Sequence, residues 1–171
     1  MRFIWTEYRR EDAETVEKWM DSTARKNMGC EDGWAEYADA CMREPETVMG
    51  ENFWLMTVSE KGTPFAAIAV GLWEGELTVS ELVVAPEKRG RGSGPALLAE
   101  LLENSGAILG KDFISAKAVI FPDNAASQRA FEKAGFRFES AHPDGDWNSR
   151  RYAYGASGRR SYFDTHAARY C

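Results

Sequence analysis

The feature that most constrains this chain is an apolar strand that leads directly into a basic, glycine-rich turn. The apolar run over 82–84 ends at Ala85-Pro86, and residues 87–95 read Glu-Lys-Arg-Gly-Arg-Gly-Ser-Gly-Pro before an apolar helix. Glycines at alternate positions let the backbone turn sharply and leave its N–H groups uncovered. The first N–H groups of a helix, together with its dipole, attract an anion. The stretch therefore predicts a phosphate cradle.

The same stretch predicts how the following helix begins. We expect Gly94 to be its N-cap and Pro95 its first residue, where a missing N–H costs nothing. Lys88, Arg89 and Arg91 add positive charge around the turn. The alternative interpretation is a basic surface turn with flexible glycines.

Two common phosphate-binding motifs do not fit this turn. A dinucleotide-binding G-x-G-x-x-G would need a glycine where Pro95 or Leu97 stands, and no G-K-[ST] ends the loop as a Walker A motif requires. What remains is R-x-x-G-x-G, formed by Arg89, Gly92 and Gly94. It resembles the pyrophosphate-binding motif of the GNAT acetyltransferase superfamily, which binds acetyl-coenzyme A.

A second stretch, Asn124 to Phe136, resembles the GNAT helix N-x-x-[AS]-x-x-x-[YF]-E-K-x-G-F and stands at the spacing that the family shows. It is also a well-capped helix, with Asn124 or Asp123 accepting from the first-turn N–H groups. Gly135 suits the left-handed position after the helix, where Phe136 can contact Phe131. The two motifs together identify the chain as similar to the GNAT family.

Composition limits the other classes of function. The 171 residues suit one domain, and 44% hydrophobic with 28% charged residues is typical of a soluble globular protein. The net charge of −6 argues against a nucleic-acid partner, and no apolar run is long enough for a membrane span. Three cysteines and two histidines predict neither a disulfide framework nor a metal site. We expect a reduced, cytoplasmic protein.

The hydrophobic patterns predict one mixed α/β (α+β) domain over 1–155. Strands are expected over 2–8, 53–58, 65–73, 77–84, 113–121, 136–139 and 149–154, and helices over 13–21, 32–43, after the glycine turn and over 125–134. This order matches the GNAT fold. The resemblance implies a mixed, mostly antiparallel sheet of about six to seven strands, flanked by about four helices, whose fourth and fifth strands splay apart. The tail 156–171 is expected to dock, to pair with a second copy as a homodimer, or to be disordered.

The resemblance also implies where acetyl-coenzyme A binds. Its pantetheine arm would lie along the backbone of Leu82, Val83 and Val84, and the Val84 N–H would stabilise the oxyanion. The pyrophosphate would meet the glycine turn. The residues implied there, with those of the second motif, are Arg89, Gly90, Arg91, Gly92, Ser93, Gly94, Pro95, Asn124, Ser127 and Phe131.

Glu81 is the candidate general base or acceptor-binding residue, because it is the only carboxylate inside the otherwise apolar run 77–84. A partly buried glutamate has a raised pKa, which suits a base that works near neutral pH. The alternative is a structural ion pair between Glu81 and Arg150 or Arg151.

The general acid and the acceptor site are less defined by the sequence. Phe131 stands where many family members carry a tyrosine acid, so either the thiolate leaves unaided or Ser127, Tyr152 or Tyr154 substitutes. Trp34, Tyr37 and Trp147 are candidates for binding the acceptor, with core packing or a simple turn as the alternative. The expected function is acetyl transfer to the amine of a small molecule or peptide, and the alternative is a non-catalytic acyl-coenzyme A sensor or interaction domain.

Overall fold

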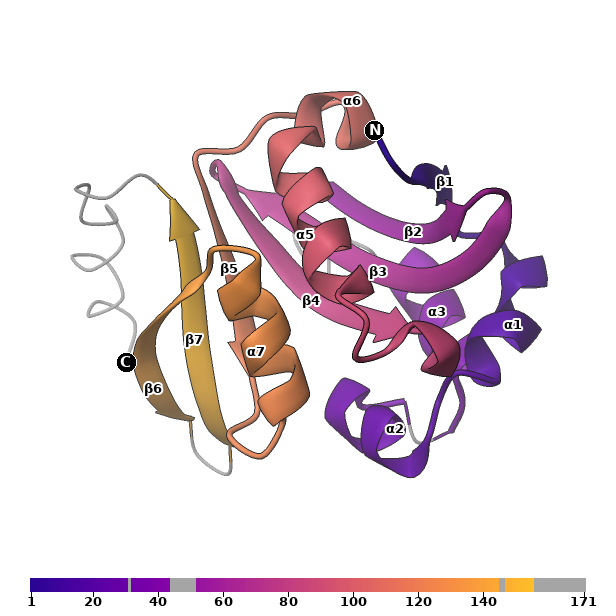
Figure 1. Cartoon of the computed structure of the whole chain (residues 1–171). Helices are drawn as coiled ribbons and strands as arrows, with labels where there is room; N and C mark the ends of the chain where they lie inside the picture. Colours follow the sequence, from indigo (N-terminus) through magenta and orange to yellow (C-terminus); the bar gives the residue numbers. More distant parts are fainter. Residues whose placement is uncertain (31, 44–51, 145–146, 156–171) are drawn as a thin grey trace.

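The computed structural model describes residues 1–30, 32–43, 52–144 and 147–155. They form a seven-stranded sheet in the order β1-β2-β3-β4-β5-β7-β6, in which β4 and β5 are parallel and all other neighbours antiparallel. The predicted fold class is confirmed (Figure 1). The strands are β1 Ile4–Glu7, β2 Asn52–Glu60, β3 Thr63–Trp73, β4 Glu76–Val84, β5 Ser115–Ile120, β6 Arg137–Asp144 and β7 Trp147–Gly155.

Helices cover both faces of the sheet, with α5 and α7 on the near face in Figure 1 and α3 behind the strands. The described α-helices are α1 Ala13–Glu17, α2 Ser22–Met28, α3 Trp34–Arg43, α5 Ser93–Glu103, α6 Ser105–Leu109 and α7 Ala125–Lys133. Two of them, α2 and α6, were not predicted. The expected helix over 13–21 ends early because the Asp21 side chain accepts the Ala24 N–H at 2.8 Å and starts a new helix there.

Two tight turns connect these elements, and the sequence analysis predicted the second of them, at Gly135. The hairpin between β3 and β4 pairs Trp73 with Glu76, and both turn residues, Glu74 and Gly75, have positive φ. At the end of α7, Gly135 has a φ of 98° and the Phe136 N–H donates to the Phe131 carbonyl at 3.0 Å. The Phe131 and Phe136 rings are in contact, with their centroids 4.9 Å apart, as the motif predicted.

The start of α5 differs from the prediction. Gly92, with a φ of 82°, is its N-cap, and the helix begins at Ser93 rather than Pro95. Pro95 is the third helical residue, where its missing N–H still costs no intrahelical bond, because the first such bond runs from Ala96 N–H to the Gly92 carbonyl at 3.1 Å. Asn124 caps α7 as expected, accepting the Ser127 N–H at 3.2 Å.

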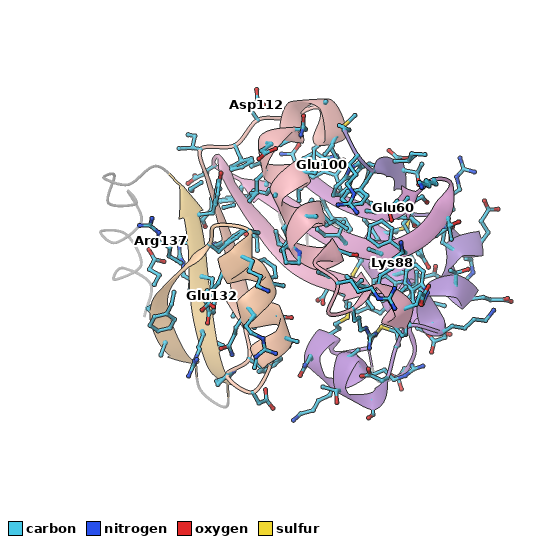
Figure 2. All side chains as sticks on the ribbon, viewed as in Figure 1. Glu60, Lys88, Glu100, Asp112, Glu132 and Arg137 are labelled. Atoms are coloured by element: carbon cyan, nitrogen blue, oxygen red, sulfur yellow. The ribbon has the colours of Figure 1, made fainter. Side chains whose placement is uncertain are left out.

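A buried carboxylate on α5 holds the N-terminal strand, which hydrophobic patterning did not predict. Glu100 is labelled in Figure 2 on the face of α5 that meets the sheet, and it is 8% exposed. Its carboxylate accepts the backbone N–H of Phe3 and the indole N–H of Trp5, both at 3.0 Å, and also the Arg2 N–H. Burial opposes its ionisation, but these donors lower the pKa of Glu100 overall.

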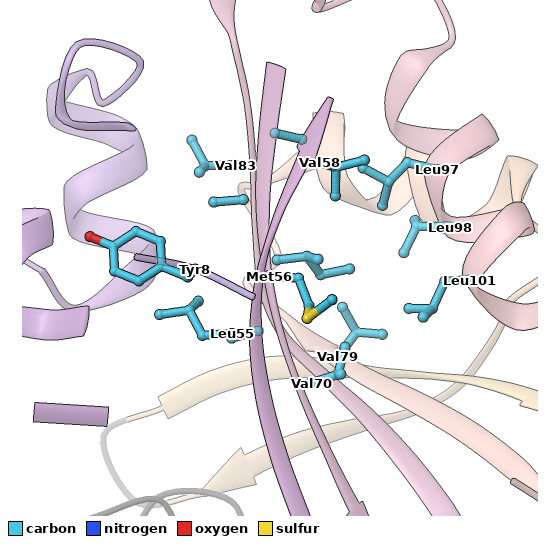
Figure 3. Packing of buried hydrophobic residues seen from close by; sticks show 14 of the residues in the cluster. Tyr8, Leu55, Met56, Val58, Val70, Val79, Val83, Leu97, Leu98 and Leu101 are labelled. Carbon is cyan, nitrogen blue, oxygen red and sulfur yellow. The ribbon is translucent and has the colours of Figure 1, made fainter. Parts of the chain in front are cut away.

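An extra residue in β4 changes which face its side chains meet. Ala69 pairs with Glu81 while its neighbour Val70 pairs with Val79, so Ser80 is a β-bulge. Figure 3 shows the result: Val79 lies on the side of Leu97, Leu98 and Leu101, whereas Val83 lies on the side of Tyr8 and Leu55. Since side chains alternate along a strand, Glu81 shares the face of Val83. Without the bulge, Val79, Glu81 and Val83 would all lie on the face of the sheet that α5 covers.

The sheet opens at the same point. β4 and β5 pair only over Glu76–Val79 and Ser115–Ala118, and beyond Val79 the two strands diverge (Figure 1). Among the described strands, residues 80–84 therefore have no partner on the β5 side. The splay that the family resemblance implied is confirmed, and it begins at the bulge.

Candidate active site

A cavity of about 550 Å³ lies at the open end of the gap between the glycine turn, the end of β4, α2 and α7. This volume is typical of sites for small organic ligands. Most of the residues predicted to hold the cofactor line it: Leu82, Val83, Val84, Arg89, Gly90, Gly92, Ser93, Gly94, Pro95, Asn124 and Ser127. Arg91 is exposed and does not line it.

The backbone of β4 presents free polar groups to this gap. The Ala85 N–H donates to the Phe65 carbonyl of β3 at 2.7 Å. Successive N–H groups of a strand point to opposite sides, so those of Leu82 and Val84 point away from β3 and into the gap. Where a ligand arm enters the gap, these two groups are its strand-like partners.

The glycine turn is shaped for close approach of a ligand to its backbone. Gly90 and Gly92 have φ values of 70° and 82°, a region that side-chain-bearing residues rarely adopt. Gly94 is helical, and a Cβ there would lie 3.9 Å from Ala130 Cβ and 4.0 Å from Val84 Cγ2. At these three positions no side chain narrows the cavity where the turn meets α5.

Two basic residues of the turn are already paired within the protein. The Lys88 Nζ lies 2.7 Å from a Glu60 carboxylate oxygen, and Figure 2 shows the two side chains together. Arg89 donates from Nε to the Val84 carbonyl at 2.8 Å and from Nη1 to Asp21 at 2.7 Å, and its Nη2 donates to the Trp19 carbonyl. Its donors are directed into the protein rather than into the cavity.

The charge that faces the cavity from α7 was not predicted. Arg129 and Lys133 line its wall, and neither has an ion-pair or hydrogen-bond partner within the described part of the chain. The sequence contained the information needed to predict this pair, because both residues lie in the second motif four positions apart and therefore share one helix face.

A smaller cavity of about 60 Å³ continues the gap inward to Glu81. Phe131 lines it, and five residues line both cavities: Asn27, Met28, Leu82, Asn124 and Ser127. Asn27 and Met28 belong to α2, the helix that the sequence analysis missed. The turn and Glu81 thus line two adjoining cavities.

Glu81 is half-buried, and the Tyr37 hydroxyl donates to its Oε1 at 2.9 Å. Burial raises the pKa of Glu81 to about 8, although the Tyr37 hydrogen bond opposes the shift. The alternative ion pair with Arg150 or Arg151 is wrong. Arg151 pairs with Glu76 and Glu139, and Arg150 bonds to the Gln128 side chain at 3.2 Å.

The other candidate residues are distributed differently. Trp34 is fully buried between the rings of Tyr8 and Tyr37 and lines neither cavity. Tyr152, 1% exposed, packs on Phe138 and also lines neither cavity. Of the residues proposed to replace the tyrosine acid, only Ser127 faces the gap. The Trp147 side chain and the tail 156–171 lie outside what the structure describes.

Among the described residues, no group of three or more histidine, cysteine, aspartate or glutamate side chains is placed to hold a metal ion. None of the helices described is long and apolar enough to cross a membrane. Cys30 and Cys41 are buried free thiols.

Comparison with known proteins adds to this geometry. Residues 8–136 match the sequence model of the acetyltransferase (GNAT) family. No curated protein matches the chain significantly in sequence.

Solved structures match most of the chain at low sequence identity. The aminoglycoside acetyltransferase AAC(6')-Ib in complex with coenzyme A matches with a TM-score of 0.70 and 16% identity, over 90% of this chain and 94% of that one. Spermidine N-acetyltransferase from Vibrio cholerae, in complex with coenzyme A and spermine, matches with a TM-score of 0.68 and 13% identity, over 90% and 95%. A GNAT-family acetyltransferase from Bacillus anthracis matches with a TM-score of 0.67 and 20% identity, over 90% of this chain and 95% of that one. At these identities the likeness is one of fold.

Proposed function

Because this chain belongs to the GNAT acetyltransferase family, whose cofactor is acetyl-coenzyme A, we propose that it is an N-acetyltransferase acting on a primary amine. The acceptor is a small molecule, an amino acid, an antibiotic or a peptide N-terminus. Structural neighbours crystallised with spermine and kanamycin support an amine acceptor.

One observation carries this proposal: two adjoining cavities link the glycine turn to the half-buried carboxylate of Glu81. The outer cavity has the volume and the bare glycine wall that a pyrophosphate needs, with Arg129 and Lys133 facing it. The inner cavity ends at Glu81. Between them, the Leu82 and Val84 N–H groups point into the gap, which suits an extended arm.

The residues of the gap divide the chemistry among them. When bound, acetyl-coenzyme A supplies the acetyl group as a thioester. Glu81 accepts a proton from the acceptor amine, and its raised pKa suits this role near neutral pH. The Val84 N–H donates to the oxygen on which negative charge develops. As the amine nitrogen bonds to the acetyl carbon and the carbon–sulfur bond breaks, the thiolate leaves unaided or takes a proton from Ser127, whose residue lines both cavities.

The test measures binding and turnover separately. Acetyl-coenzyme A at a hundredfold over its dissociation constant adds about 2.7 kcal/mol of stability, which raises the melting temperature by several degrees. Release of free coenzyme A thiol is then followed with a panel of spermine, kanamycin, amino acids and a short peptide. Glu81→Gln, which keeps the shape of the side chain, is expected to lower turnover about 10²–10⁴-fold with unchanged cofactor affinity.

The outcomes separate the competing functions. No stabilisation by millimolar acetyl-coenzyme A or coenzyme A would rule out the cofactor site. Stabilisation without thiol release for any amine would favour the non-catalytic sensor, the candidate that Phe131 in place of the usual tyrosine supports.

A further inference from the structure

Tyr37 lies on α3, the helix behind the strands in Figure 1, and its side chain contacts Glu81 of β4. Its ring packs against Trp34 with centroids 5.6 Å apart, and Trp34 is completely buried. The Trp34 backbone N–H is held by the Glu17 carboxylate at 2.7 Å at the start of α3. The Tyr37 hydroxyl is therefore presented from a rigid support.

The Tyr37 hydroxyl forms a hydrogen bond with one carboxylate oxygen of Glu81 and not with the other. It donates to Oε1 at 2.9 Å, and no hydrogen bond to Oε2 is found among the described residues. The bulge at Ser80 turns Glu81 towards the Tyr37 side of the sheet. The two features place one carboxylate oxygen against the phenol.

We infer that Tyr37 is a positioning residue that fixes Glu81 so that Oε2 is the oxygen that takes the proton of the acceptor amine. The inference rests on the proposed function for the role of Glu81, but the hydrogen bond itself is independent of it. A donor that stabilises the carboxylate holds it ionised at a lower pH than burial alone would allow.

The other titratable groups around Glu81 do not change charge near neutral pH. Tyr37 and Cys41 come from α3, and Cys30 precedes that helix. Burial raises the pKa of all three, that of Cys30 to about 11. They remain neutral near pH 7, so Glu81 is the group of this cluster that titrates there.

Tyr37→Phe tests the inference, because it removes the hydroxyl and keeps the ring that packs on Trp34. Tyr8→Phe is the matched control: the Tyr8 ring packs on the opposite side of Trp34 with centroids 6.1 Å apart, and within the described part of the chain its hydroxyl makes no hydrogen bond to Glu81. We expect Tyr37→Phe to move the acid limb of the kcat/KM profile up by about one to two pH units. Activity at pH 7 falls about tenfold or more and recovers above the limb, whereas Tyr8→Phe leaves the limb in place.

A second readout does not require activity. A carbon-13 NMR titration of the glutamate carboxyl groups gives the Glu81 midpoint, which Glu81→Gln identifies by the signal that disappears. The midpoint is expected to rise in Tyr37→Phe and stay unchanged in Tyr8→Phe. An unchanged midpoint in folded Tyr37→Phe would overturn the inference, even if acetyl transfer is established. A raised midpoint in a protein without transferase activity would support the hydrogen bond and count against the proposed function alone.

If Tyr37→Phe does not fold, the wild-type protein provides the test. The Tyr37 ring-carbon signal next to the hydroxyl is expected to shift with the Glu81 midpoint, because the phenol donates to the group that ionises. Independent titration of the two signals would overturn the inference.

Discussion

Arg89 donates to the Asp21 carboxylate at 2.7 Å, and this contact joins the glycine turn to the N-cap of α2. The other Asp21 oxygen accepts the Ala24 N–H, so one aspartate both starts α2 and holds the arginine. Since α2 contributes Asn27 and Met28 to both cavities, the arginine of the R-x-x-G-x-G motif positions the wall of the gap.

Breaking this contact should affect the gap more than the overall fold. Arg89→Gln and Asp21→Asn are each expected to cost about 1 kcal/mol of stability, because the pair is largely exposed. Each should also weaken coenzyme A binding, and the double variant should lose less than the sum. Calorimetric binding and denaturant unfolding check this, with the exposed Arg91→Gln as control. Strictly additive losses would contradict the coupling.

The glycine turn offers a matched pair of substitutions. Gly92 and Gly62 have φ values of 82° and 80°, and an added Cβ at either would contact nothing within 4 Å. Both alanine variants should therefore lose about 1 kcal/mol of stability from backbone strain. Only Gly92→Ala, in the cavity wall, is expected to weaken coenzyme A binding. Equal affinities in the two variants, measured by calorimetry, would show that the turn does not contact the phosphates.

A substitution at Gly94 tests whether the ligand needs the space beside this glycine, because it adds a side chain without straining the backbone. Its φ is ordinary, and a Cβ there would make only normal contacts with Ala130 and Val84. Gly94→Val should therefore fold with nearly wild-type stability but fill part of the cavity. Loss of coenzyme A binding with an unchanged melting temperature is the expected result; unchanged binding would show that this wall is not used.

The raised pKa of Glu81 predicts how stability depends on pH. Its folded pKa of about 8 lies above the unfolded value of about 4.3, so between these values the unfolded state loses the proton first. The wild type should lose stability across this window relative to Glu81→Gln, by at most about 1.4 kcal/mol per pH unit, and level off above pH 8. Urea unfolding at several pH values measures the difference, with the exposed Glu87→Gln as control. A constant difference would contradict the raised pKa.

Glu100 predicts the opposite dependence. Its lowered pKa means that its contribution is present above the unfolded pKa and is lost as the pH falls through the folded pKa. Glu100→Gln should cost about 1–3 kcal/mol at pH 7, because a neutral amide accepts less strongly from Phe3 and Trp5. The exposed Glu103→Gln, on the same helix, should change little. The difference between the two variants should shrink in acid, as measured by unfolding at pH 3 and pH 7.

Much of the fold follows from local sequence. The cap at Asn124, the left-handed Gly135 and the hairpin at Glu74-Gly75 depend on residues a few positions apart, so neighbouring residue types determine them. The apolar residues of β3, which lead into that hairpin, indicate a buried central strand in the same way. The motif spacing then indicates the family and the general location of its cofactor.

The site itself depends on contacts between distant segments. A bulge at Ser80 decides which face Glu81 meets, and no residue type near it signals that extra position. The pairing of Glu81 with Tyr37, rather than with Arg150 or Arg151, joins α3 to β4 across the fold. By itself the sequence determined the capped helices, the strands and the glycine turn, because short-range hydrogen bonds and backbone preferences specify them. Only the tertiary structure decided which charges are paired and which face the gap, because that depends on how separate elements pack.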